Sequence, residues 1–373
     1  MNKRIAFSLI ILSIMSLCVV SASTVKASPK TIVVPEDYST IGWAVGNATD
    51  GDTIYVKSGI YNETIIIDKP LSLEGENRET TVIDCGKDKT VVTITQDHVN
   101  VTGFTIRNGT ESRVGLPDLW VGVHLMNANY CNISGNKIIG NGYGVKLDSS
   151  HDNSLVENYV IDNVNGIRLD LSPNTRITRN IITANREVGI DVRSSCNYIS
   201  IVENNITKSK TGIDCSANFA SVIRNTVSEN SAAGITVFSS NCSIIENDIT
   251  NNDKGVWLYV ATENVTFYHN NFVNNTIQVD TFLGYGSFWD NGKEGNYWSD
   301  YLTKYPNASE IDNSGIGNIP FVIDANNTDH YPLVKQYIIP EFPSWIILPL
   351  VVTAMLLTVL LIRRKKTRLH YSL

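Results

Sequence analysis

The chain has 373 residues, of which 42% are hydrophobic, and its 30 Lys and Arg against 37 Asp and Glu give a net charge of −7. Eight of the basic residues lie within residues 1–27 or 344–373, which contain no acidic residue, so the region between them is more strongly acidic. This balance excludes a nucleic-acid-binding protein, disfavours a strongly anionic polymer as ligand, and favours neutral glycans or cations.

Residues 1–27 are predicted to be a secretory signal peptide. Two basic residues precede an apolar run over residues 5–20, and small residues follow up to a cleavage site after Ala27. Export suits the eleven N-x-[Ser/Thr] sequons, which are potential N-glycosylation sites. Five cysteines remain after cleavage, and without a C-x-x-C motif they are predicted to be stacked or buried thiols: Cys85, Cys131, Cys196, Cys215 and Cys242.

Residues 28–100 are predicted to form an N-terminal cap and the first coils of the fold. The segment TIVVPEDYSTIGWAVGNATDGDTIYV, from Thr31, resembles the N-terminal module of pectin-lyase-like β-helices, especially NosD-like proteins. The resemblance implies a short amphipathic helix over about residues 39–47 that covers the open end of the core. A cover is physically required, because the first coil would otherwise expose apolar side chains and unpaired backbone.

Residues 101–280 contain an internal repeat with a period of about 22 residues. A Gly-[Val/Ile]-x-[Leu/Val/Cys] pattern begins at Gly122, Gly144, Gly166, Gly189, Gly212, Gly234 and Gly255. A ladder of asparagines keeps step with it: Asn136, Asn158, Asn180, Asn204, Asn225, Asn247 and Asn270. Each repeat holds three short apolar runs, and at roughly 3.3 Å per residue it has room for three strands but no helix. The prediction is an all-β fold, a right-handed parallel β-helix with three strands per coil.

The first strand of each repeat alternates in polarity. The first and third residues after the glycine are apolar in all seven repeats, so a period of two places them inside and their neighbours outside. We expect the glycine at a turn, where a positive φ is cheap. We expect the asparagine amides to stack at about 4.8 Å and to hydrogen-bond along the solenoid, which is a structural role.

The outer face of this first strand is the candidate functional surface. Equivalent side chains of adjacent coils lie about 5 Å apart, so Lys146, Arg168, Asp191 and Asp214 are predicted to form one column, with Asp148, Asp170 and Arg193 beside it. The candidate catalytic residues are Lys146, Arg168, Asp170, Asp191 and Asp214. The candidate glycan-binding residues are His124, Arg193 and an aromatic patch of Phe238, Trp257 and Tyr259.

Three interpretations of this face remain open. Opposite charges alternate down the columns, with Arg168 over Asp191 and Asp170 over Arg193, as on an ordinary solvated sheet. Aromatic rings with carboxylates are also typical of a sugar-binding groove. Alternatively, Asp214 with Asp191 or Asp170 could be the carboxylate pair of a glycoside hydrolase, or Lys146 or Arg168 the base of a polysaccharide lyase with Ca²⁺ on the aspartates.

The predicted function is non-catalytic binding of polysaccharide or scaffolding of cell-envelope glycans, with a carbohydrate-active enzyme as the alternative. The hydrolase and esterase motifs of pectin-lyase-like enzymes are absent. A second alternative is the copper-binding or maturation role that the name of the NosD-like family implies. Copper needs soft or imidazole ligands that converge, whereas Met126 stands alone between the two ends and the histidines are scattered. The sequence therefore predicts no metal site and no cofactor.

Residues 281–336 are predicted to close the solenoid. The motif GNYWSDY, at residues 295–301, and the segment from 315 to 333 resemble the closing part of NosD-like archaeal surface proteins. The resemblance to this family therefore spans about residues 31–333. The aromatic residues Trp289, Tyr297, Trp298 and Tyr301 are predicted to plug the C-terminal end.

The C-terminal end is predicted to anchor the protein in a membrane. Residues 337–343 form a linker with the motif PEFP, residues 344–362 are mostly apolar and about 28 Å long as a helix, and residues 363–373 are a basic tail. Basic residues after the span keep the tail inside and the rest of the chain outside, at the cell surface. The three parts resemble PEF-type sorting signals of archaeal surface proteins, which are cut and replaced by another anchor; a plain membrane helix is the alternative.

Overall fold

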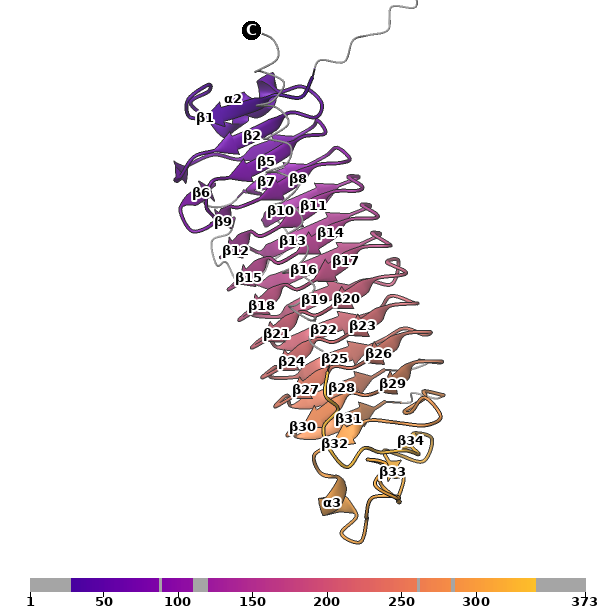
Figure 1. Ribbon diagram of the computed structural model, residues 1–373. Helices are drawn as coiled ribbons and strands as arrows, with labels where there is room; N and C mark the ends of the chain where they lie inside the picture. The colour runs from indigo at the N-terminus through magenta and orange to yellow at the C-terminus, as the bar shows by residue number, and fades with distance from the viewer. Residues whose placement is uncertain (1–27, 87–88, 110–119, 260–261, 283–285, 340–373) are drawn as a thin grey trace, which may run out of the picture.

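The computed structural model describes residues 28–86, 89–109, 120–259, 262–282 and 286–339. Over these ranges the chain winds into a parallel β-solenoid of the right-handed type, which confirms the predicted all-β fold and its repeat (Figure 1). The predicted signal peptide, membrane segment and basic tail lie outside the described residues. No helix inside those ranges has the length and hydrophobicity needed to cross a membrane.

Three parallel sheets, which we name A, B and C, form the sides of the solenoid. Sheet A has 11 strands: β1 (Thr31–Val34), β2 (Thr53–Val56), β5 (Ser72–Gly75), β8 (Asn100–Thr102), β11 (Asn132–Ser134), β14 (Ser154–Val156), β17 (Arg176–Thr178), β20 (Ser200–Val202), β23 (Ser221–Ile223), β26 (Ser243–Ile245) and β29 (Thr266–Tyr268). Sheet B also has 11: β3 (Gly59–Tyr61), β6 (Thr81–Asp84), β9 (Thr105–Arg107), β12 (Lys137–Ile139), β15 (Tyr159–Ile161), β18 (Ile181–Thr183), β21 (Asn205–Thr207), β24 (Thr226–Ser228), β27 (Asp248–Thr250), β30 (Asn271–Val273) and β32 (Tyr297–Trp298). Sheet C has 10: β4 (Ile65–Ile67), β7 (Val92–Ile94), β10 (Val121–Met126), β13 (Tyr143–Asp148), β16 (Asn165–Asp170), β19 (Val188–Val192), β22 (Thr211–Cys215), β25 (Ala233–Val237), β28 (Lys254–Leu258) and β31 (Ile277–Thr281).

The hydrophobic core runs along the axis of the solenoid. All fourteen apolar residues that the alternation of the repeat predicted to point inward, on strands β10 to β28 of sheet C, are buried. Successive coils pair them in register, as in Val145 with Ile167 and Leu147 with Leu169. Each coil therefore buries its apolar side chains against the coils above and below it.

The repeat glycines lie inside the strands of sheet C and not at turns, so the expected positive φ is wrong. Their role is to allow close approach of the backbone. A Cβ on Gly166 would lie 2.3 Å from the carbonyl oxygen of Gly189, and one on Gly144 would lie 2.7 Å from that of Gly166. Any larger residue would force neighbouring coils apart.

The predicted asparagine ladder is confirmed between sheets A and B, and all seven members are buried. Asn158 Nδ2 donates to Asn180 Oδ1 at 3.0 Å and to the carbonyl oxygen of Ile133 at 2.8 Å. The ladder extends one rung beyond the prediction, because Asn270 Nδ2 donates to Asn296 Oδ1 at 2.9 Å. Each amide thus joins its own coil to the preceding and the following one.

A second asparagine ladder, which the sequence analysis missed, lies between sheets B and C. Its bonded neighbours are Asn141 with Asn163, Asn163 with Asn185, Asn230 with Asn252, and Asn252 with Asn275. Ser209 occupies the intervening position, where its backbone N–H donates to Asn230 Oδ1 at 3.0 Å. The ladder is interrupted by this shorter side chain.

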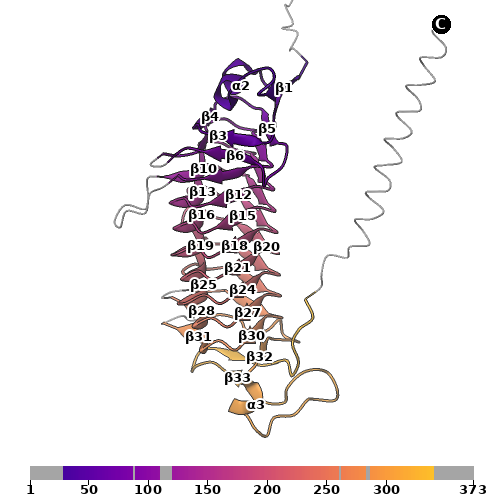
Figure 2. The same cartoon turned by 90° about the vertical axis from the view of Figure 1, so that its left-hand side faces the viewer.

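The short helix α2 (Ile41–Asn47) lies at the N-terminal end, close to the predicted range (Figure 2). Its buried residues Ile41, Ala44 and Val45 belong to the hydrophobic core. Glu63 accepts the N–H groups of Ile41 and Gly42 at 2.9 and 2.8 Å, which satisfies donors at the helix N-terminus. Lys69 donates to carbonyl groups at the other end of the helix.

The C-terminal end is closed by β32, the helix α3 (Tyr301–Lys304), and the strands β33 (Phe321–Val322) and β34 (Thr328–Asp329). The rings of Phe272, Trp298 and Phe321 stack in series, with centroids 4.4 and 4.3 Å apart. Trp289, Trp298 and Tyr301 are buried as predicted, whereas Tyr297 is only half-buried.

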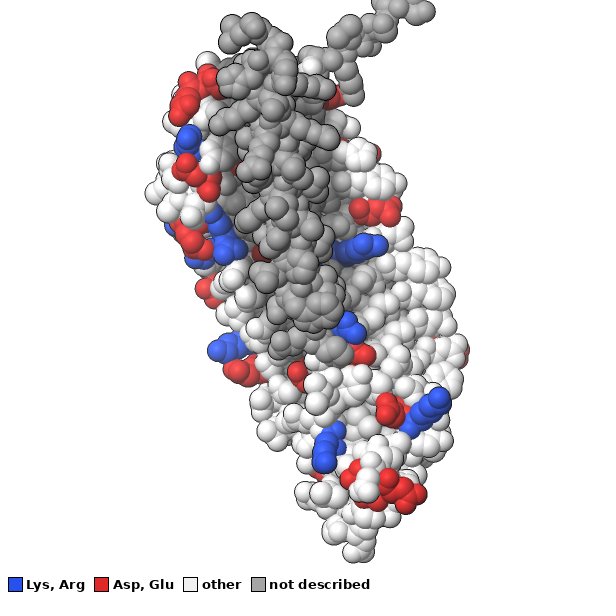
Figure 3. All heavy atoms as spheres, in the orientation of Figure 1, with Lys and Arg blue, Asp and Glu red and all other residues white. Residues whose placement is uncertain are grey.

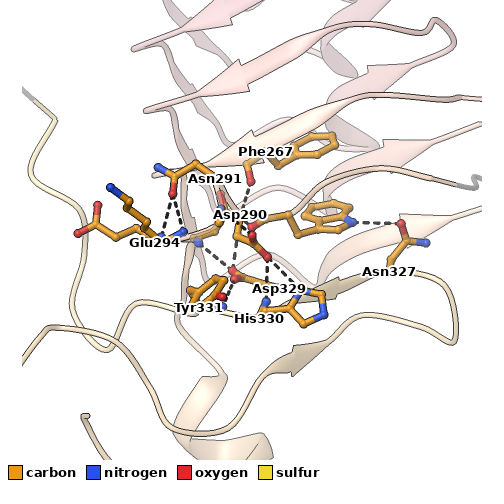
Figure 4. A network of polar contacts seen from close by, with 12 residues as sticks. Phe267, Asp290, Asn291, Glu294, Asn327, Asp329, His330 and Tyr331 are labelled. Carbon is orange, nitrogen blue, oxygen red and sulfur yellow. Dashed lines mark hydrogen bonds and ion pairs between the residues drawn. The ribbon is translucent and has the colours of Figure 1, made fainter. Parts of the chain in front are cut away.

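The asparagine ladder ends on a carboxylate, Asp329, in this closing segment (Figure 4). Asp329 Oδ2 accepts the backbone N–H of Asn296 at 2.8 Å and the indole N–H of Trp298 at 2.9 Å. Asp329 Oδ1 accepts the N–H of Tyr331 at 3.0 Å. Burial raises the pKa of Asp329 to about 6, against the lowering effect of these hydrogen bonds.

We predict that Asn204→Ala lowers the free energy of unfolding by at least about 2 kcal/mol, because buried donors and acceptors in two neighbouring coils lose their partners. The adjacent Asn205 is exposed, and Asn205→Ala should change stability by no more than about 0.5 kcal/mol. Urea denaturation of both variants tests this. Equal effects of the two substitutions would contradict the structural role of the ladder.

Candidate functional site

The strand register of sheet C places the predicted column on one outer face. Lys146 pairs with Arg168, Arg168 with Asp191, and Asp191 with Asp214. His124 is the neighbour of Lys146 at the N-terminal side, and Asp148 lies beside Asp170 in the second column. The four side chains of the first column therefore follow one another along the solenoid.

Two arginines surround Asp191. Arg168 Nε contacts Asp170 Oδ2 at 2.7 Å and its Nη1 lies 3.4 Å from Asp191 Oδ2, while Arg193 Nη2 lies 3.1 Å from the same oxygen. The expected stacking of Asp170 over Arg193 is replaced by this arrangement. Strand β19 ends at Val192, but the backbone N–H of Arg193 still donates to the carbonyl of Leu169 at 3.1 Å, and the guanidinium group of Arg193 contacts Asp191 of its own coil.

Asp191 occupies an outward-facing position but is only 3% exposed. Its Oδ1 atom has no hydrogen-bond partner among the residues that the structure describes. Burial raises the pKa of Asp191, although Arg193 and Arg168 act in the opposite direction. An unsatisfied carboxylate oxygen at this depth is costly, and it marks the centre of the face as a place where a hydrogen-bond donor would be stabilised.

Asp214 is the next residue of the column. Burial, and after it the neighbouring Asp191, raises the pKa of Asp214 to about 6, while Arg193 lowers it. Two adjacent carboxyl groups that both bind protons more tightly than usual can hold a proton near neutral pH. This is the electrostatic setting in which a carboxyl group can serve as a general acid.

The N-terminal part of the face is a separate charge cluster. Asp148 Oδ2 lies 2.6 Å from His124 Nε2 and 3.0 Å from Lys146 Nζ. Burial would raise the pKa of Asp148, but the hydrogen bonds from His124 and Lys146 lower it overall. The phenol of Tyr143, which the sequence analysis did not single out, accepts a hydrogen bond from Arg168 Nη1 at 3.3 Å. No repeating signal marks Tyr143, because the other coils have different residues there.

The predicted aromatic patch is present and larger than expected. The ring centroids of Phe238 and Tyr259 are 4.8 Å apart, and those of Trp257 and Tyr259 are 5.8 Å apart. Phe282, one coil further, lies 5.6 Å from Tyr259 and is 51% exposed. Phe282 directly follows β31, as Tyr259 follows β28, so the coil spacing could have identified it.

The charged residues and the aromatic patch lie on the same side of sheet C. Thr236 pairs with Asp214 on one side and with Trp257 on the other. Lys254 Nζ lies 4.2 Å from the ring centroid of Trp257 and 2.6 Å from Asp280 Oδ2, which fixes the edge of the patch. The face can therefore offer ring surfaces, hydrogen-bond donors and carboxylates to one extended ligand.

The donor groups do not fit a copper site. Within the described ranges, no three His, Cys, Asp or Glu side chains are grouped so that they could hold a metal ion. His124, His269 and His330 each contact a single carboxylate, on Asp148, Glu294 and Asp290 respectively. The thiols of Cys215 and Cys242 are buried on either side of Ser239 and share no histidine. Copper prefers imidazole or soft ligands that converge.

The fold and this face define a class of protein: a parallel β-solenoid with a charged and aromatic outer sheet. Residues 45–221 and 215–303 match the sequence profile of the family described as "Periplasmic copper-binding protein (NosD)". The chain belongs to the NosD family. No curated protein matches its sequence.

Several solved structures are similar in fold. The Dettilon tailspike protein gp208 has a TM-score of 0.53 and 15% sequence identity, over 72% of this chain and 62% of its own. The Geobacillus virus E2 protein ORF18 has a TM-score of 0.50 and 14% identity, over 85% and 69%. Alginate lyase from Paenibacillus sp. str. FPU-7 has a TM-score of 0.49 and 16% identity, over 69% and 97%. The chain spans 62% of the tailspike, and at these identities the likeness concerns the fold alone.

We predict that Asp214→Asn reduces the dependence of stability on pH. The folded pKa of Asp214, about 6, lies above the ordinary value of 3.8. The contribution of Asp214 to the free energy of unfolding is therefore fully present below pH 3.8 and is lost as the pH rises through about 6. The urea midpoint of the wild type should fall over this range, and that of Asp214→Asn should fall less.

Asp329 also stabilises the folded state at low pH and loses this effect over the same pH range, because its pKa is also raised to about 6. The informative quantity is therefore the difference between the wild type and Asp214→Asn at each pH. Identical pH profiles for the two proteins would show that Asp214 titrates normally in the folded state.

Proposed function

We propose that the outer face of sheet C binds extended polysaccharide chains of the cell envelope without chemical turnover. The aromatic patch of Phe238, Trp257, Tyr259 and Phe282, in line with the charged column, is the observation that carries this proposal. Exposed apolar rings gathered in one place are typical of interaction sites. The flat apolar faces of sugar rings can pack on such side chains while their hydroxyl groups reach the neighbouring polar groups.

The charge pattern supports a neutral glycan. The cations of the column are paired with carboxylates, Lys146 with Asp148 and Arg168 with Asp170 and Asp191. Little uncompensated positive charge remains here to attract an anionic polymer. Guanidinium groups and carboxylates held in this way can donate to and accept from sugar hydroxyls. No metal or other cofactor is part of the proposal.

The cellular setting is also a proposal. The description of the NosD family as periplasmic supports export of this chain, as the predicted signal peptide does. We place the solenoid outside the cell, held to the membrane by residues 344–362 or by a processed PEF-type signal. The eleven sequons, among them Asn132 and Asn205, would then be available for glycosylation.

Binding of a neutral polysaccharide panel to the purified full-length chain tests the proposal. We expect Trp257→Ala and Tyr259→Ala to weaken the affinity of sheet C roughly tenfold each, because a stacking surface is lost. Trp43, 68% exposed on helix α2, provides a matched control, and Trp43→Ala should leave affinity unchanged. Equal affinity of the wild type and the Trp257→Ala protein, measured by calorimetry, would contradict the proposal.

One observation favours a second candidate function, acid–base catalysis on the same glycan. Asp214 has a pKa of about 6 and lies beside the buried Asp191, so it can hold and release a proton near neutral pH. In a glycoside hydrolase, the separation of such a pair decides between retaining and inverting chemistry. Release of reducing ends from the polysaccharide panel, abolished in Asp214→Asn, would replace the binding proposal by this one.

A further inference from the structure

A groove of about 750 Å³ lies on the outer face of sheet A, away from the face described above. Its floor is formed by β14, β17 and β20, where the register pairs Ser154 with Arg176 and Arg176 with Ser200. Tyr130 and Tyr198 line its two ends along the solenoid. Three coil steps separate these tyrosines, which corresponds to about 14 Å.

The edge of this groove is a column of turn residues with a repeated backbone geometry. In each coil the N–H of the turn residue donates to a carbonyl of the next coil, as Tyr130 does to His151 and Tyr198 to Asn218. All members of the column have a positive φ: His98, Tyr130, Asp152, Asn174, Tyr198, Phe219, Asn241 and Asn264. Asn and Asp tolerate this conformation, whereas for bulky residues it is unfavourable.

Three coils therefore place an aromatic residue where the backbone favours Asn or Asp. Tyr130, Tyr198 and Phe219 have φ values of 55°, 60° and 59°. Their side chains gain little from burial, because they are 52%, 60% and 45% exposed. Neither local conformation nor core packing explains these aromatic residues, and exposed apolar rings gathered in one place are typical of interaction sites.

Tyr198 and Tyr130 each stack on an aromatic ring in the coil on the side away from the groove, and Tyr130 has a second neighbour, His151, in the coil toward it. Tyr198 stacks on Phe219 of the following coil, with centroids 5.0 Å apart and an interplanar angle of 12°. Tyr130 stacks on His98 of the preceding coil with centroids 5.2 Å apart and an interplanar angle of 13°, and the ring of His151 lies nearly perpendicular to it at 5.6 Å. The groove lies between the two stacks, where the short residues Asp152 and Asn174 occupy the turn position.

The floor and the far wall offer both hydrogen-bond donors and acceptors. Ser154, Ser200 and Thr178 supply hydroxyl groups, and the exposed Arg176 supplies a guanidinium group in the middle of the floor. On the far wall, Arg179 is paired with Glu157 at 2.9 Å, and Glu203 lies in the next coil. On the side of the molecule where Figure 1 places sheet A, the visible described surface is mostly white with scattered charges of both signs (Figure 3).

We propose that this groove is a second glycan-binding site, which holds a short stretch of a neutral glycan between Tyr130 and Tyr198. Sugar rings would pack on the two tyrosine faces, and their hydroxyl groups would bond to Arg176, Ser154 and Ser200 on the floor. The carboxylates of Asp152 and Glu203 accept hydroxyl donors, and with Arg176 and Arg179 they leave the lining with no excess of either charge, which suits a neutral glycan. The site is independent of the face of sheet C, and the two together would hold separate stretches of polysaccharide.

Isothermal titration calorimetry of the full-length chain with neutral hexasaccharides (cellohexaose, mannohexaose and xylohexaose) tests this site, with hexagalacturonate as the acidic comparison. Tyr198→Ala and Arg176→Ala should each weaken the affinity of one class of sites roughly tenfold. Tyr198→Phe, which keeps the ring, should change that affinity by less than about twofold. Trp257→Ala on sheet C should leave the affinity of this class of sites unchanged. Circular dichroism checks that each variant is folded. If the Tyr198→Ala protein does not fold, the Arg176→Ala protein still tests the groove.

The outcomes separate this proposal from the function proposed for sheet C. Two classes of sites, of which Tyr198→Ala removes one and Trp257→Ala the other, would support both. One class that is sensitive to Tyr198→Ala and insensitive to Trp257→Ala would support the groove alone. Binding that none of the groove variants changes, or binding of hexagalacturonate in place of the neutral sugars, would overturn the proposal.

Discussion

The buried asparagine amides fix how each coil sits on the next. In the ladder between sheets A and B, Asn180 donates to the carbonyl of Leu155 in the preceding coil at 2.8 Å and to Asn204 in the following coil at 2.9 Å. Its own Oδ1 accepts from the backbone and side chain of Asn158. These bonds satisfy backbone groups where the chain turns and no sheet ladder can do so. A coil that slipped by one residue would leave several of these groups unpaired and buried.

The fixed register aligns the outward side chains of successive coils. Because coils repeat without slippage through most of the solenoid, a residue type that recurs at one position becomes a column. On sheet C this places Asp191 beside Asp214 and Phe238 in the coil before Tyr259. On sheet A it aligns the turn residues whose short and aromatic members form the groove. The core sets the spacing of the coils, and the outward positions are not constrained by it.

The period of the repeat allowed the fold, the inward residues and the columns of sheet C to be predicted from sequence. What it could not provide is the environment of single side chains. Asp191 was placed on the outer face correctly, but its burial depends on where Arg168 and Arg193 turn, and Arg193 leaves the strand. The repeat glycines were identified, but they were expected at turns. They are needed for close backbone contact between coils, which is not visible in a sequence. The aromatic turn residues at 130 and 198 were missed because their coils are not adjacent.

A disulfide between stacked coils tests the register most directly. Thr183 and Thr207 are partners on β18 and β21, with their Oγ1 atoms 2.8 Å apart, and adjacent parallel strands bring Cα atoms within disulfide distance. In the Thr183→Cys/Thr207→Cys protein, mild oxidation followed by non-reducing mass spectrometry should show this bridge. In Thr183→Cys/Ser228→Cys the residues are two coils apart, about 10 Å, and no bridge should form. A bridge in the second protein and none in the first would contradict the stacking on which the account rests.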